Sequence, residues 1–162
     1  MTEEKKDFFV SDISLSYQYT AGNATTRFLN KVAEGKLVAQ KCPKCSAVYV
    51  PPRGSCPRCG VATEEELELP DTGAVESFTI VHIPIPGNPI VPPYVSAMIR
   101  LDGADISFLH LIQEIDLADI RIGMRVQAVW KDKSDWGTTL ENIKWFKPNG
   151  EDDVDPTVYK LK

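Results

Sequence analysis

The chain has few of the residues that enzymes use for covalent or acid–base catalysis. Its 162 residues include four cysteines and only two histidines, His82 and His110. The histidines stand far apart in apolar stretches of strand character, where an imidazole is more often a satisfied structural group than a base. No serine nucleophile elbow, glycine-rich phosphate loop or histidine-rich metal motif accompanies them. The sequence therefore predicts a protein that is not an enzyme by itself.

Positive charge is also scarce. Lysine and arginine total 18 against 23 aspartates and glutamates, which gives a formal net charge of -5 and a pI near 5.1. Nonspecific binding of nucleic acid relies on an excess of lysine and arginine that neutralises phosphates. The composition therefore argues against nucleic acid as a partner.

Long hydrophobic runs are missing as well. No stretch reaches the length of about 18 apolar residues that a membrane-spanning helix needs. The first residues, MTEEKKDFF, carry no apolar core of the signal-peptide type. We therefore expect a cytoplasmic protein without membrane contact, in a compartment where thiols stay reduced and available to metal.

All four cysteines lie in two Cys-Pro-x-Cys motifs. Cys42 and Cys45 frame the first motif, Cys56 and Cys59 frame the second, and the ten residues 46–55 separate them. Each motif lets a tight turn present two sulfurs to one ion, and the spacer suits a short hairpin. The pattern predicts one structural zinc ion in a closed site that leaves no position for water or substrate and no thiol for nucleophilic catalysis. Iron, a redox dithiol pair and disulfides are the alternatives that the spacing leaves open.

Length and composition allow one ordinary domain and one small metal-stapled module. Residues 24–34 show helical spacing of apolar side chains, with Asn23 or Thr25 as the N-cap and Gly35 as the stop. The predicted parts are an N-terminal arm and helix at 1–35, a zinc ribbon at 36–69, a barrel domain at 70–147 and an extended acidic C-terminal tail at 148–162. We expect the tail to be mobile in the free protein and to order against a partner.

The part after the cysteines is rich in short β-type runs. Five such runs occupy residues 74–83, 95–101, 106–111, 125–131 and 140–146. A helical turn fits between the third and fourth runs, at 115–124, which is where five-stranded OB barrels place a connection. The fold class is therefore mainly β, and the spacing alone leaves an OB barrel, another small barrel and a sandwich open.

The link between the first two runs is a proline-rich loop at residues 84–93. Its five prolines remove amide donors and fix backbone angles, so the loop is stiff and lies outside the sheet. Three apolar residues, Ile85, Ile90 and Val91, have no obvious place in a barrel core. They either fold back over one end of the barrel or form a contact surface for a partner or an acyl ligand.

The order of these motifs resembles the DUF35 family. The residues that carry the resemblance lie between 27 and 146 and read, in order, FLNKVAEGKL, QKCPKC, VPPR, CPRCG, FTIVH, the proline-rich loop, PYV and IGMRV. The resemblance implies a rubredoxin-like zinc ribbon joined to an OB fold, and it makes the OB barrel the favoured fold.

The resemblance also implies a catalytic partner. DUF35 proteins are typically small subunits or appended domains of thiolase-superfamily enzymes, in which the large subunit carries the catalytic residues. The implied function is a non-catalytic zinc-containing subunit that stabilises such a partner and shapes its acyl-CoA entrance. We expect a degradative β-oxoacyl-CoA thiolase resembling benzoylsuccinyl-CoA thiolase. The alternatives are a steroid side-chain retro-aldolase of the SCP2-thiolase type and an OB-fold nucleic-acid module.

Several residues are candidate contacts for the partner or for a coenzyme A thioester held at the interface. Arg53 and Arg58, with Lys41 and Lys44, form the local basic cluster near the cysteines and could meet coenzyme A phosphates. They could equally offset the negative charge of a zinc tetrathiolate. The remaining candidates come from the proline-rich loop and its exit: Ile85, Ile90, Val91 and Tyr94.

Overall fold

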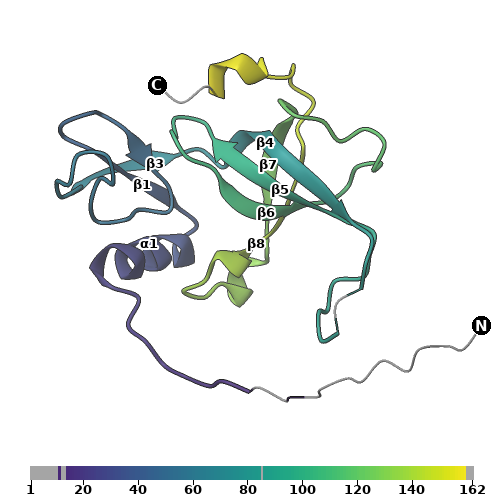
Figure 1. Ribbon diagram of the computed structural model, residues 1–162, viewed down its shortest axis with the longest axis horizontal. Coiled ribbons are helices and arrows are strands. Elements are labelled where there is room, and N and C mark those ends of the chain that lie inside the picture. The colour runs from purple at the N-terminus through teal and green to yellow at the C-terminus, as the bar shows by residue number, and fades with distance from the viewer. Residues whose placement is uncertain (1–10, 12–13, 85, 160–162) are drawn as a thin grey trace, which may run out of the picture.

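The computed structural model describes residues 11, 14–84 and 86–159 (Figure 1). Its elements are α1 (Asn23–Ala33), β1 (Leu37–Lys41), β2 (Val48–Tyr49), β3 (Glu65–Leu69), β4 (Thr72–Val81), β5 (Tyr94–Leu101), β6 (Phe108–Ile112), β7 (Arg125–Trp130), the short 3-10 helices η1 (Lys133–Asp135) and η2 (Leu140–Asn142), β8 (Ile143–Pro148) and η3 (Pro156–Tyr159). One helix and a small sheet form one unit, and a barrel forms the other. Ile85, one of the predicted contact residues, lies outside the described residues.

Helix α1 packs one apolar face inward through Phe28 and Val32. Its N-cap is Gly22, with no side-chain cap, so the prediction of Asn23 or Thr25 was wrong. The reason is that the Thr26 amide already bonds to the Gly22 carbonyl, at 2.9 Å, which starts the helix earlier than its apolar pattern does.

The helix ends at Ala33, and Gly35 is the stop that follows it, as predicted. The Gly35 amide bonds to the Val32 carbonyl and the Lys36 amide to the Lys31 carbonyl, a pair of bonds that requires a left-handed residue. Gly35 has a φ of 79°. A Cβ there would also lie 2.5 Å from the Trp136 ring of the barrel unit, so both the backbone and the packing need glycine.

The first sheet has the order β2-β1-β3, with both pairings antiparallel. Strand β1 is its centre and buries four successive residues, as expected for a strand covered on both faces. Strand β3 is an edge strand with exposed glutamates, and Glu65 lies directly across from Lys41, with 3.9 Å between the charged groups. The glutamate run is therefore a charged sheet edge, which discourages pairing with other chains.

The barrel closes in the order β4-β5-β6-β8-β7. The mainly β fold and the five predicted strands are confirmed, and β5 shows the alternating burial of a strand with one face in the core. The fifth strand starts later than predicted, because Leu140–Asn142 form η2, in which the Thr139 side chain accepts a hydrogen bond from the Glu141 amide. Residues 115–124 contain two hydrogen-bonded turns, from Asp116 to Asp119 and from Arg121 to Met124, and no helix.

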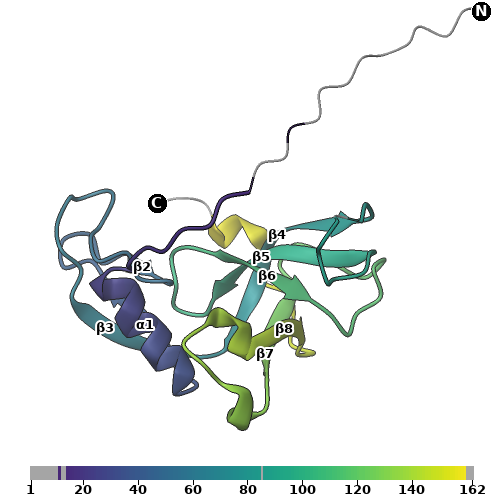
Figure 2. The same ribbon diagram turned by 90° about the horizontal axis from the view of Figure 1, so that it is seen from below.

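The two units share a continuous hydrophobic core. Phe28 and Val32 of α1 and Leu37 of β1 belong to the same buried cluster as Val75 and Phe146 of the barrel. Figure 2 shows α1 and the loop that carries η1 and η2 side by side, and α1 contacts η2 directly. The ribbon unit is therefore packed onto the barrel and is more than a tethered module.

The segment after β8 lies along the barrel of its own chain. The Val154 amide bonds to the Gly123 carbonyl at 2.8 Å, and Glu151 pairs with Arg125 at 2.7 Å. The Arg121 guanidinium forms a bidentate pair with Asp153. Glu151 and Asp153 thus find their partners within the chain, while docking of the tail on another protein stays a prediction.

No helix in the described part of the chain is long and apolar enough to cross a membrane.

Candidate metal centre and partner-binding surface

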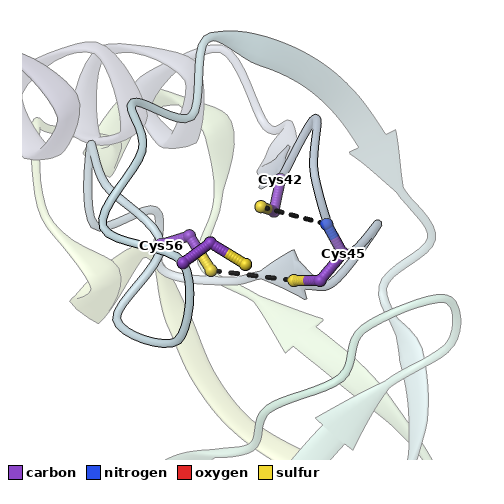
Figure 3. Close-up of side chains that lie close together, drawn as sticks. Cys42, Cys45 and Cys56 are labelled. Atoms are coloured by element: carbon purple, nitrogen blue, oxygen red, sulfur yellow. Dashed lines mark hydrogen bonds between the residues drawn. The ribbon is translucent and has the colours of Figure 1, made fainter.

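The four cysteines converge on one point of the ribbon unit. Their sulfur atoms all lie within 4.8 Å of one another, and the Cys45 and Cys56 sulfurs are 3.7 Å apart. Figure 3 shows the sulfurs of Cys42, Cys45 and Cys56 turned toward a common centre. Cys42 and Cys56 are buried, Cys59 is partly buried and Cys45 is exposed. The site therefore has an inner side against the protein and an outer side toward solvent.

Two knuckles of the same geometry build the site. In the first, the Cys42 amide bonds to the Ala47 carbonyl at 2.8 Å, and the Ser46 amide bonds to the Cys42 carbonyl at 2.9 Å. In the second, the Cys56 amide bonds to the Val61 carbonyl and the Gly60 amide to the Cys56 carbonyl, both at 2.8 Å. The residue after each second cysteine is left-handed, with φ of 61° at Ser46 and 65° at Gly60. This shared turn is what points two sulfurs of each motif at one ion.

Hydrogen bonds reach a cysteine sulfur in both knuckles. The amides of Lys44 and Cys45 lie 3.4 Å from the Cys42 sulfur. The Tyr49 hydroxyl lies 3.3 Å from the Cys56 sulfur and is the main reason that the pKa of Cys56 is lowered to about 6. The same hydrogen bond raises the pKa of Tyr49 to about 12, so the hydroxyl keeps its proton and acts as the donor.

The donor set fits a tetrahedral metal ion. Sulfurs about 2.3 Å from one zinc ion stand about 3.8 Å apart, which matches the separation of the Cys45 and Cys56 sulfurs. Burial raises the pKa of the Cys59 thiol, so four thiolates gathered here need a cation to balance their charge. Four sulfurs complete a tetrahedron, and such a site stabilises the fold without binding substrate.

The predicted contact residues fall into two groups that the fold keeps apart. Arg53 and Arg58 are exposed on the ribbon unit, whereas the hairpin loop between β4 and β5 lies at the far end of the barrel in both ribbon views (Figures 1 and 2). In that loop Val91 is 81% exposed and Ile90 is half-buried. The half-buried Tyr94 accepts a 3.4 Å hydrogen bond from the Asn88 amide group. One small ligand could not touch both groups.

Two hollows on the barrel flank this loop. A hollow of about 190 Å³ contains Val91 and Tyr94 with apolar neighbours such as Ile112 and Leu117. A wider one of about 550 Å³ is lined mainly by apolar atoms, with Leu109, His110 and Leu111 of β6 on one side. The complete lining of the wider hollow is Pro89, Ser96, Leu109, His110, Leu111, Lys131, Leu140, Glu141, Ile143 and Lys144. The sequence signal for this surface is Leu109. It is apolar, but it follows the core-facing Phe108 in β6, so the alternation of a strand places it on the outer face, where it is exposed.

The two histidines lie on different segments and in different surroundings. His110 lies in β6, accepts a 2.9 Å hydrogen bond from the Leu111 amide at Nδ1, and packs edge-on against Phe146 at 5.4 Å. Burial is the main cause that lowers the pKa of His110, so the ring is neutral near pH 7. His82 is exposed beyond the end of β4. His110 is therefore held in place by a backbone hydrogen bond and by ring packing within the barrel.

The indole groups of the three tryptophans are all engaged within the chain. Trp130 donates to Asp71 at 3.0 Å, Trp136 to the Lys131 carbonyl at 2.8 Å, and Trp145 to Glu114 at 2.9 Å. They come from β7, the loop before η2, and β8. These hydrogen bonds tie each tryptophan to a neighbouring segment of the barrel unit.

A four-cysteine ribbon packed on a closed five-stranded barrel defines a protein of the zinc-ribbon and OB-fold class. Similarity to known proteins identifies its family. Residues 30–65 match the rubredoxin-like zinc ribbon domain of ChsH2, and residues 66–131 match the C-terminal OB-fold domain of ChsH2. A DUF35 domain-containing scaffold protein of Methanocaldococcus jannaschii is 37% identical over 117 residues, which cover 69% of this chain and 81% of that protein. The chain belongs to the DUF35 family.

Two further relatives bear the names of an enzyme or an enzyme subunit, and a third has no known function. A probable enoyl-CoA hydratase alpha subunit of Thermomonospora curvata is 34% identical over 95 residues, and the match covers 59% of this chain but only 29% of that protein. The solved Ltp2-ChsH2(DUF35) aldolase has a chain with a TM-score of 0.60 and 27% identity, covering 80% of this chain and 98% of its own. A DUF35 protein of unknown function from Sulfolobus solfataricus shares the fold, with a TM-score of 0.61, 24% identity, and coverage of 79% and 87%.

Proposed function

We propose that the chain is a non-catalytic, zinc-containing accessory subunit of an acyl-CoA enzyme whose catalytic subunit belongs to the thiolase superfamily. In this proposal it stabilises that subunit and shapes the entrance for the acyl-CoA substrate. The finer proposal is a degradative β-oxoacyl-CoA thiolase resembling benzoylsuccinyl-CoA thiolase. A cytoplasmic location belongs to the proposal, because four free thiolates need a reducing compartment to hold zinc.

One observation carries the non-catalytic part. All four cysteine sulfurs are gathered within 4.8 Å, in a set that suits a metal ion. Thiolase chemistry needs a reactive cysteine together with histidine bases. This chain commits its cysteines to the ribbon and keeps His110 in β6, bonded and packed within the barrel. The scaffold name of the archaeal relative supports the same interpretation.

The proposed contact surface runs from the proline-rich loop along the outer face of β6. Val91 and Leu109 are exposed there, next to hollows that can receive side chains of another protein. Apolar groups held on a proline-rich loop lose little conformational freedom on binding. Arg53 and Arg58, on the other unit, are proposed to approach the phosphates of a coenzyme A thioester bound by the partner.

An aldolase is the second candidate for the partner. The solved aldolase complex contains a DUF35 chain that this chain matches over most of its length. The two candidates share the accessory role and differ in the reaction of the catalytic subunit. The identity of that subunit decides between them.

The test is reconstitution of activity. The purified zinc-loaded chain is assayed with β-oxoacyl-CoA and β-hydroxyacyl-CoA substrates, alone and after addition of the catalytic subunit that purifies with it. We expect turnover only with the catalytic subunit present. Turnover by the chain alone that is lost in both His82→Ala and His110→Ala would overturn the proposal.

A further inference from the structure

The arm that precedes α1 has the sequence pattern of a β-strand. Residues 14–20 read Ser-Leu-Ser-Tyr-Gln-Tyr-Thr, with apolar or aromatic side chains at every second position. Such alternation is typical of a strand that buries one face. The rings of Tyr17 and Tyr19 lie 6.0 Å apart, so these two side chains share one side of the extended chain.

The arm does not bury that face on its own chain. Leu15, Tyr17 and Tyr19 are 81%, 76% and 80% exposed. Residues 14–20 take part in none of the strand pairings found in the described structure. Figure 1 shows the arm leaving the start of α1 and running clear of both units. Large apolar and aromatic side chains that are exposed at every second position indicate a strand that binds another protein, because this strand pairs with no sheet in the described part of its own chain.

Gly22 sets the direction in which the arm leaves. Its backbone angles, φ 77° and ψ 163°, belong to a region that only glycine adopts without strain. Its carbonyl is held by the first hydrogen bond of α1, from Thr26 at 2.9 Å. The arm is therefore attached through a residue whose unusual conformation turns the chain away from the helix and the ribbon sheet.

We propose that residues 14–20 add as a β-strand to an exposed sheet edge of the catalytic partner, with Leu15, Tyr17 and Tyr19 in pockets beside that edge. The inference rests on the proposed function, because it names the same partner. Main-chain hydrogen bonds supply affinity in this mode of binding, and alternate side chains supply specificity. Tyrosines suit the role, since they bring large contact area at low cost in side-chain entropy.

The chemistry of the arm predicts how this contact responds to salt. Residues 14–20 carry no charged side chain. Their contribution to affinity should therefore be unaffected by ionic strength, unlike contacts made by exposed charges, which salt screens.

The test compares two matched triple variants of the full chain. The first is Leu15→Thr with Tyr17→Thr and Tyr19→Thr, and the control is Ser14→Thr with Ser16→Thr and Gln18→Thr. Both keep the length and strand propensity of the arm. We expect the first variant to weaken binding to the purified catalytic subunit about tenfold or more and the control to stay within about twofold of the unchanged chain, at both low and high salt.

Residue-resolved hydrogen exchange supplies the second readout. Amides of residues 14–20 should exchange freely in the chain alone and become protected at every second residue in the complex, as pairing along one edge requires. A complex that forms with these amides unprotected, or equal effects of the two variants, overturns the arm proposal and leaves the proposed function standing. Failure to find a catalytic subunit overturns both, and protection in a dimer of this chain alone overturns the arm proposal.

Discussion

The side-chain amide of Asn142 donates a hydrogen bond to the backbone carbonyl of Val32, 3.2 Å away, across 110 positions of sequence. Both residues are completely buried. The same amide group binds the Gly137 carbonyl at 2.7 Å, and its oxygen accepts from the Gly137 amide at 3.0 Å. Asn142 therefore ties the last loop of the barrel to the helix that covers the ribbon sheet.

Loss of this side chain should destabilise both units together. We expect Asn142→Ala to lower the free energy of unfolding by about 2 to 4 kcal/mol, because it removes a buried side chain and the three hydrogen bonds that this side chain makes. Tryptophan fluorescence, which reports on the barrel unit, and far-ultraviolet circular dichroism, which reports on α1 as well, should shift to the same lower urea midpoint. The exposed Asn30→Ala is the control. Separate transitions in the variant would show that the units do not depend on each other in this way.

Tyr49→Phe should weaken the metal site without unfolding it. The exchange removes only the hydroxyl that donates to the Cys56 sulfur at 3.3 Å. Hydrogen bonds to metal ligands of this kind are typically worth about tenfold or more in metal affinity. Competition with a chromophoric chelator at constant pH measures the change, and Tyr94→Phe, which removes a hydroxyl of the barrel, is the control. Equal zinc affinities of the two variants would contradict the role assigned to Tyr49.

The stability of the chain should fall in mild acid because of His110. Burial lowers the pKa of this imidazole below its ordinary value of 6.5, so the unfolded chain takes up a proton before the folded chain does. Stability is then fully present above pH 6.5 and declines as the pH falls toward the folded-state pKa. Protonation would also place a charge beside Lys131 and Lys144, which line the same hollow.

Urea midpoints measured at several pH values check this prediction. The decline in the range just below pH 6.5 should be smaller in His110→Gln than in the unchanged chain. His82→Gln, at an exposed position, serves as the control. An unchanged slope in His110→Gln would show that other groups cause the acid sensitivity.

Val91→Asp should weaken the complex with the catalytic subunit. Val91 is the most exposed large apolar residue of the proline-rich loop that the structure describes, and a carboxylate there would have to be desolvated at an apolar interface. We expect a loss of affinity of about tenfold, measured by titration calorimetry. Ile122→Asp, exposed on the loop before β7, is the matched control. Equal affinities for Val91→Asp and the unchanged chain would show that the loop stays outside the interface.

The metal centre could be predicted almost completely from the sequence, because its ligands are local. Cys42 and Cys45 depend on a turn of a few residues, and so do Cys56 and Cys59, so spacing alone specifies the cluster. The Tyr49 hydroxyl escaped prediction since its contact depends on how β2 pairs with β1. No local pattern encodes that register.

The strands of the barrel were predictable because hydrophobic alternation is a property of each strand. The start of β8 was placed too early, since Leu140 is apolar but belongs to a 3-10 turn capped by Thr139. The acidic segment after β8 was interpreted as an arm for a partner. Its pairing with Arg121 and Arg125 could not be foreseen, because those arginines lie far away in the sequence. For the same reason the core shared by α1 and the barrel became visible only in the structure.

The central claim is that this chain works as the accessory subunit of an acyl-CoA enzyme. The most direct test is purification of the tagged full chain from its own cells under native conditions, followed by identification of the proteins present in constant ratio with it and measurement of bound zinc. The account predicts a thiolase-superfamily catalytic subunit in stable association and one zinc ion per chain. A chain that purifies alone, or with nucleic acid that dissociates as salt is raised, would contradict it.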